Sequence, residues 1–174
     1  MATEGGAEAP NTETVQALID RRADVNLATL GLKGKPQNSG VSALTQACDY
    51  GSLEVVQVLL AANADIRHAM HDGRTALYQA AKSGYVDIIQ LLLDHENKNG
   101  QGLQVGEKAL PNVAAHDGTT ALMQAANYGQ LETVKLLLEH GAHADASSDN
   151  ENTALVLACE DGHVEVAQLL LRQA

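Results

Sequence analysis

The chain has 174 residues, a formal net charge of −11 at pH 7 and a pI near 4.9. Long-range repulsion from this charge disfavours binding to nucleic acid and to anionic membrane surfaces, so a protein partner should be neutral or basic; alternatively, the charge only keeps a Leu-rich protein soluble. No stretch approaches the roughly 18 apolar residues of a membrane span, and the start carries no signal-peptide run, which predicts a cytoplasmic or nuclear chain or a cytosolic domain of a membrane protein.

A flexible tail is predicted at residues 1–10, ahead of one repeat domain at 11–174. The domain is marked by a Ser/Thr-Ala-Leu tripeptide that recurs in steps of 33, 45 and 33 residues and begins at Ser42, Thr75, Thr120 and Thr153. A period near 33 indicates neighbouring units that share one continuous core and display function on their surface. The units are a partial repeat at 11–40 and repeats at 41–73, 74–118, 119–151 and 152–174.

Two short helices are predicted in each full unit. In the repeat at 119–151, the first helix has a narrow apolar face of Leu122, Ala125 and Ala126, and the second has a stripe of Leu131, Val134, Leu137 and Leu138. Between the two helices each unit has a glycine, where a positive φ would let the chain reverse: Gly51, Gly84, Gly129 and Gly162. A polar tip with hairpin-turn chemistry follows, as in His71-Asp72-Gly73 and His116-Asp117-Gly118.

Two Gly-rich polar insertions break the period, at about 27–39 and about 96–108. We expect both to be mobile loops, which either grew neutrally or carry specialised contacts. Cys48 and Cys159 take the same inward-facing place in their helices, three repeats apart, so we expect two buried free thiols.

These units resemble the ankyrin repeat, because residues 75–87 read Thr-Ala-Leu-Tyr-Gln-Ala-Ala-Lys-Ser-Gly-Tyr-Val-Asp and residues 140–142 read His-Gly-Ala. The resemblance covers nearly the whole chain and implies an all-α ankyrin-repeat solenoid of stacked helix-turn-helix units with projecting hairpin tips. Residues 11–26 match only a second helix. The final helix, at 162–174, has apolar residues that no further repeat covers, so either it is less buried than its sequence favours or the chain is part of a longer array.

The resemblance also implies a partner-binding strip made of the first helices and the tips. On the first helices the strip comprises Gln46, Asp49, Tyr50, Gln79, Lys82, Ser83, Gln124, Asn127, Tyr128, Glu160 and Asp161. On the tips it comprises Met70, His71, Asp72, Arg74, His116, Asp117, Thr119, Asp149, Asn150 and Asn152. Among these, Tyr128 and then Tyr50 are predicted hot spots, because tyrosine supplies rigid amphipathic contact area, or else each shields the end of its own helix. Tyr78 and Tyr85 are predicted to be structural.

The sequence contains no recognisable catalytic motif. His68-x-x-His71 and His140-x-x-His143 each offer two imidazoles, whereas a zinc site needs three or four converging ligands, so we expect no metal, no cofactor and no catalysis. His140 instead suits the dipole at a helix end. The context Asp24-Val25-Asn26 resembles ankyrin segments that are hydroxylated on Asn, which makes Asn26 a candidate modification site, although a structural turn role comes first.

The sequence therefore predicts a binding module, most simply a monomer, that recognises a protein or peptide through the strip and carries no catalysis. Two alternatives stay open. One is a regulatory or sensory domain of a larger enzyme or ion channel. The other is a structural unit that oligomerises through its bare last helix.

Overall fold

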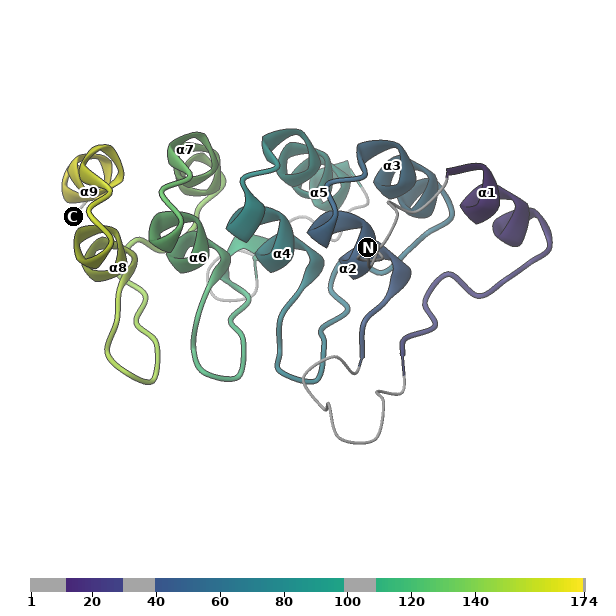
Figure 1. Cartoon of the computed structure of the whole chain (residues 1–174), viewed down its shortest axis with the longest axis horizontal. Coiled ribbons are helices and arrows are strands. Elements are labelled where there is room, and N and C mark those ends of the chain that lie inside the picture. The colour runs from purple at the N-terminus through teal and green to yellow at the C-terminus, as the bar shows by residue number, and fades with distance from the viewer. Residues whose placement is uncertain (1–11, 30–39, 99–108, 174) are drawn as a thin grey trace, which may run out of the picture.

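The computed structural model describes residues 12–29, 40–98 and 109–173 as a row of stacked helix pairs, drawn in Figure 1. The short first helices form one row and the second helices form another, and the tips project from the same edge (Figure 1). The first helices are α2 (Ala43–Asp49), α4 (Ala76–Ser83), α6 (Ala121–Asn127) and α8 (Ala154–Glu160). The second helices are α1 (Thr12–Asp20), α3 (Leu53–Ala61), α5 (Val86–Lys98), α7 (Leu131–Glu139) and α9 (Val164–Leu171), and a 3-10 turn, η3, spans Leu110–Asn112. The predicted all-α solenoid is confirmed.

The recurring Ser/Thr-Ala-Leu tripeptide has a physical cause, because its hydroxyl residue caps the first helix of each repeat. The Ser42 hydroxyl oxygen accepts the backbone N–H of Thr45 at 3.2 Å. The three threonines do the same at 3.3 Å, each for the residue three positions further on. Each cap satisfies an N–H that the helix itself leaves unpaired, and it fixes where the helix begins.

The first helices pack closely because their inward faces carry small side chains. Leu122, Ala125 and Ala126 are at most 1% exposed, as predicted, and α4 is packed between α2 and α6. The second helices only partly follow the predicted stripe. In α7 the buried residues are Thr133, Val134, Leu136 and Leu137, whereas Leu131 and Leu138 are half-buried.

Thr133 is the exception in this core. Its hydroxyl has no hydrogen-bond partner within the described residues, although the side chain is 1% exposed. The same place in the other repeats holds Val55, Ile88 and Val166, each 2% exposed. Substituting Thr133 by Val keeps the branched shape and removes the unpaired polar group, so we expect the free energy of unfolding to rise by about 1 kcal/mol. Urea denaturation measures this change, and an unchanged or lower midpoint would contradict it.

The tips are held to each other by backbone hydrogen bonds that cross from repeat to repeat. The N–H of His116 donates to the carbonyl oxygen of Asp72 at 2.8 Å, and the N–H of Asp149 donates to that of Asp117 at 2.9 Å. Within a tip, the Asp72 and Asp117 carboxylates accept N–H groups two residues further on, at 3.1 and 3.0 Å. The tips therefore form a continuous stack with the predicted turn chemistry.

The ends of the stack differ from its middle. Val164 and Leu171 are 63% and 60% exposed, while Val166 and Leu170 on the same helix are 2% exposed. Cys159 is exposed as well, so the prediction of two buried thiols is right for Cys48 and wrong for Cys159. The reason is that α8 packs on α6 along one side, and the described residues place no further first helix along the other.

The second insertion begins later than the sequence predicts. Residues 96–98 continue helix α5 instead of starting a loop, and Glu96 is 6% exposed. The rest of that insertion, residues 99–108, lies outside the described residues. So do most of the first insertion and the predicted tail at 1–10. No helix among the described residues has the length and apolarity that crossing a bilayer requires.

Candidate functional site

The predicted strip comprises residues of the first helices and of the tips that lead into those helices. Its exposed members are Asp49, Tyr50, His71, His116, Asp117, Tyr128, Asp149, Asn150, Glu160 and Asp161. Its half-buried members are Gln46, Asp72, Arg74, Gln79, Lys82, Ser83, Thr119, Gln124, Asn127 and Asn152. Most of the strip is thus at least partly accessible to solvent.

Met70 does not belong to this surface. It is 8% exposed, and its N–H donates to the carbonyl oxygen of Arg74 at 2.8 Å across the base of the tip. A residue that closes the turn and packs beneath it cannot present its side chain to a ligand. The prediction that Met70 contacts a partner is therefore wrong.

Tyr128 carries the most prominent exposed ring of the strip. It lies just past the end of α6 and is 48% exposed. The Nζ atom of Lys82, from the end of α4 in the preceding repeat, lies 5.6 Å from the centroid of its ring. This is a cation–π contact, and it spans two repeats. Tyr50, at the corresponding end of α2, is 40% exposed.

A second cation–aromatic pair lies closer to the tips. The guanidinium carbon of Arg74 is 5.5 Å from the ring centroid of Tyr78, and the Arg74 Nε atom pairs with the Asp72 carboxylate at 3.2 Å. Burial raises the pKa of Tyr78 above its usual value; Arg74 opposes this shift, and Asp117, Asp72 and Tyr128 add to it. Tyr78 is 5% exposed, which confirms the prediction that it is structural. Its ring lies beneath Arg74, which is a residue of the strip.

Asp117 stays ionised at the neighbouring tip. Partial burial would raise its pKa, but hydrogen bonds with Thr119 and with its own backbone, together with the charge of Arg74, outweigh this and lower it. The tip therefore presents a negative charge at neutral pH.

The strip is acidic where it is free. Asp49, Asp149, Glu160 and Asp161 are exposed and form no ion pair with any described residue. Its Lys and Arg residues are Arg74 and Lys82, and both already lie on tyrosine rings. The glutamines Gln46, Gln79 and Gln124 align in three repeats, but their amides form no hydrogen bond to one another within the described part. The free carboxylates dominate the field at this surface.

A different set of polar residues fastens each repeat to the next. The Asn26 amide oxygen accepts the N–H of Asp65 at 2.8 Å, and the Asn112 amide oxygen accepts the N–H of His143 at 2.9 Å. Asn112 also donates to the carbonyl oxygen of Gly141 at 2.9 Å. Asn26 is exposed, and its contact is the structural one that its register implies; its hydroxylation stays a prediction.

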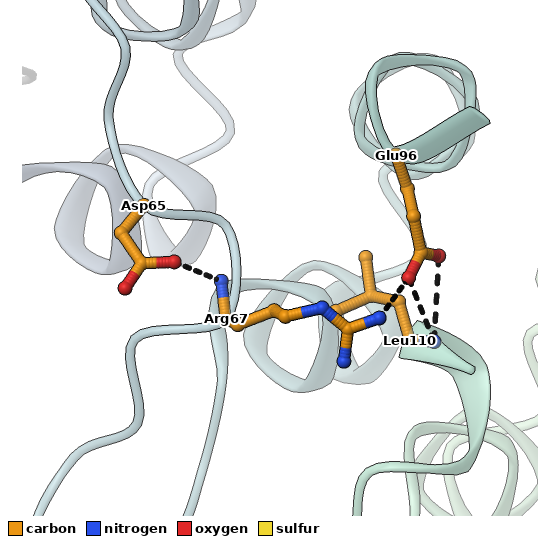
Figure 2. A network of polar contacts seen from close by, with 4 residues as sticks. All are labelled: Asp65, Arg67, Glu96 and Leu110. Carbon is orange, nitrogen blue, oxygen red and sulfur yellow. Dashed lines mark hydrogen bonds and ion pairs between the residues drawn. The ribbon is translucent and has the colours of Figure 1, made fainter. Parts of the chain in front are cut away.

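The junction between the repeats at 41–73 and 74–118 is held by a different contact. Arg67 stands at the register of Asn26 and Asn112, and an arginine side chain cannot accept an N–H group. Instead, both carboxylate oxygens of Glu96 accept the N–H of Leu110, at 3.2 and 3.3 Å, and Glu96 forms an ion pair with Arg67 (Figure 2). Sequence reasoning missed this network, although the replacement of Asn by Arg in one repeat was a usable signal.

Three histidine rings contact backbone carbonyl oxygens. His140 Nδ1 lies 2.9 Å from the carbonyl oxygen of Leu136, as its place at a helix end predicts. His163 Nε2 lies 2.9 Å from that of Asn127, and His68 Nε2 lies 2.8 Å from that of Gly40. Within the described ranges, no group of three or more His, Cys, Asp or Glu side chains is placed to hold a metal ion.

The two thiols should differ sharply in reactivity. Burial, reinforced by the neighbouring Asp49, raises the pKa of Cys48 to about 12. Because the thiolate is the nucleophile, Ellman's reagent at about pH 8 should modify Cys159 in the native chain and reach Cys48 only after unfolding. The Cys159→Ser variant should then show no native labelling; equal rates for both thiols would contradict the prediction. The burial of neutral Cys48 favours the native state below pH 9.0, the value of an unperturbed thiol, and this contribution is lost as the pH rises toward 12.

A hollow of about 620 Å³ opens beside the last repeat, between α7 and α9. Its walls are mainly aliphatic and include Leu138, Ala142, Leu155 and Leu170. It lies between the last two repeats, and none of its lining residues belongs to the strip.

Comparison with known proteins agrees with this architecture. The family model described as ankyrin repeats (3 copies) matches residues 5–102 and again residues 98–174. No curated protein matches the chain. The matches together span the helix pairs, the caps and the tips described above, and the chain belongs to the ankyrin repeat family.

Proposed function

We propose that this chain is a protein-binding module that recognises a neutral or basic protein or peptide through the strip, without catalysis. The observation that carries the proposal is the exposed ring of Tyr128 among exposed carboxylates that no described residue neutralises. Aromatic side chains in such positions anchor protein interfaces, and the surrounding charge steers a basic partner toward them. Ankyrin repeats are in general protein–protein interaction modules. The two free thiols suit the cytoplasm or nucleus, and we propose a monomer there.

Site-specific photo-cross-linking in a cell lysate tests the proposal. A benzophenone amino acid at Gln124, on the strip, should give a defined cross-linked product, and the same group at Glu132, on α7, should not. Replacing both Asn127 and Tyr128 by Ala should abolish the product formed from Gln124 while leaving the melting temperature nearly unchanged, since Tyr128 is exposed. A product that forms equally at Glu132, or that survives the double substitution, would retire the strip as the binding surface.

A further inference from the structure

We propose that the face of Tyr128 covered by Lys82 is a recognition site for an arginine side chain of the partner, which displaces Lys82 on binding. This inference rests on the function proposed above and names the chemistry that the strip recognises. The chain itself shows that the ring face binds a cation, because the Lys82 ammonium lies 5.6 Å from the ring centroid.

Lys82 is held there loosely. It is half-buried and forms no salt bridge with any of the described residues, so the contact with the ring is not reinforced by a carboxylate. Tyr128 is 48% exposed and is therefore accessible to a competing group from solvent. An internal cation of this kind occupies the site in the free protein and leaves when a better cation arrives.

The other cation–π pair of the strip provides a contrast within the same molecule. Arg74 lies over Tyr78, but it is also paired with the Asp72 carboxylate at 3.2 Å, and Tyr78 is 5% exposed. That pair is closed to a ligand. Of the two rings, only the ring of Tyr128 combines a bound cation with access from outside.

The neighbouring repeat supplies the negative charge. Helix α8 packs beside α6, and Glu160 and Asp161 take the register positions of Asn127 and Tyr128 in the next repeat. Both carboxylates are exposed and form no ion pair within the described ranges. They attract a cation to this end of the strip and repel an acidic peptide.

Arginine fits this combination better than lysine. A guanidinium group is planar, is more weakly hydrated than an ammonium group, and stacks on an aromatic ring while its N–H groups still donate to carboxylates. Lysine offers a compact, strongly hydrated charge, and Lys82 already supplies one. The partner segment should therefore be basic and should place an arginine on Tyr128.

Titration with fluorescent nona-arginine and nona-lysine, which carry equal charge, tests the inference on the full chain. Nona-arginine should bind with a Kd roughly 2–5-fold lower than nona-lysine, the range that one cation–π contact allows. Lys82→Ala should lower the Kd for nona-arginine by a further 2–5-fold, roughly, because it frees the ring. Replacing both Glu160 and Asp161 by their amides should weaken binding and reduce its dependence on salt.

Lys135→Ala is the matched control, because it removes the same charge from α7, where Lys135 pairs with Glu132 at 2.6 Å. It should leave the Kd nearly unchanged. In a Tyr128→Ala background, Lys82→Ala should no longer tighten binding, which separates the loss of a competitor from a change in net charge. Tyr128→Phe keeps the ring and should keep the effect of Lys82.

Three results would overturn the inference: no tightening by Lys82→Ala beyond that of the control, equal tightening without the Tyr128 ring, or equal affinity for the two peptides. If one of these results is found while the cross-link at Gln124 still depends on Asn127 and Tyr128, the arginine site is wrong but the proposed function is still supported. If the cross-link does not depend on Asn127 and Tyr128, the proposed function itself is wrong.

Discussion

Replacing Gly73 by Ala should lower the free energy of unfolding by about 2–4 kcal/mol, among the largest effects of a single methyl group in this chain. Gly73 has φ of +84°, where an alanine is strained. A Cβ atom there would lie 2.7 Å from the backbone nitrogen of His116 and 2.9 Å from the Cα atom of Ala115. Both are backbone atoms of the next tip and cannot rotate away. The tips would have to separate, which breaks the hydrogen bond from the His116 N–H to the Asp72 carbonyl.

Gly141→Ala provides the control for this prediction. Gly141 has nearly the same φ, +82°, but a Cβ atom built on it meets nothing within 4 Å. The control therefore carries the conformational strain alone and should cost about 1–2 kcal/mol. Thermal and urea unfolding of both variants measure the difference, which is the contribution of the tip contact. Equal destabilisation would mean that the tips do not depend on close stacking.

Only part of the environment of Gly73 can be predicted from the sequence of its own repeat. The Asp-Gly pair at Asp72 and Gly73 predicts the turn from local chemistry, and the structure confirms that turn. That the space beside Gly73 belongs to the next tip is a fact of stacking, which local chemistry does not contain. The repeat period did predict the helices and the inward-facing alanines correctly, because capping and packing recur with the same period.

The predictions that failed concern exposure and side-chain contacts, which depend on the neighbouring repeats and on how the tip closes. Cys159 has the register of a buried residue, but burial there needs a following helix, so register alone misplaced it. Met70 has the register of a tip residue, yet it closes the tip from inside. The contact between Lys82 and Tyr128 joins positions one residue apart in register across two repeats, and side-chain reach of this kind is set by the stacking distance. The sequence predicts which residues share a surface better than it predicts which of them touch.

Glu96→Ala should lower the free energy of unfolding by about 2–4 kcal/mol, because it removes the acceptor of a buried N–H group. The N–H of Leu110 donates to both Glu96 oxygens, and Leu110 is 1% exposed, so water cannot easily replace the carboxylate. Arg67 loses its ion pair with Glu96, although its side chain is 29% exposed and regains part of its hydration. Glu54→Ala, an exposed position on α3, should change stability by less than about 0.5 kcal/mol.

Adding Arg67→Asn to Glu96→Ala should restore most of the lost stability. Asn26 and Asn112 stand at the same register as Arg67, and each accepts the N–H that corresponds to that of Leu110, at 2.8 and 2.9 Å. An asparagine at position 67 therefore supplies the missing acceptor and also removes the guanidinium that has lost its ion pair with Glu96. Arg67→Asn alone should not raise the free energy of unfolding above that of the native protein, since it leaves the buried Glu96 carboxylate without its cation. Urea unfolding of both single variants and of the double variant gives the interaction energy of the double-mutant cycle. If the two losses of stability simply add in the double variant, then Glu96 does not supply the acceptor that the Arg67 side chain lacks.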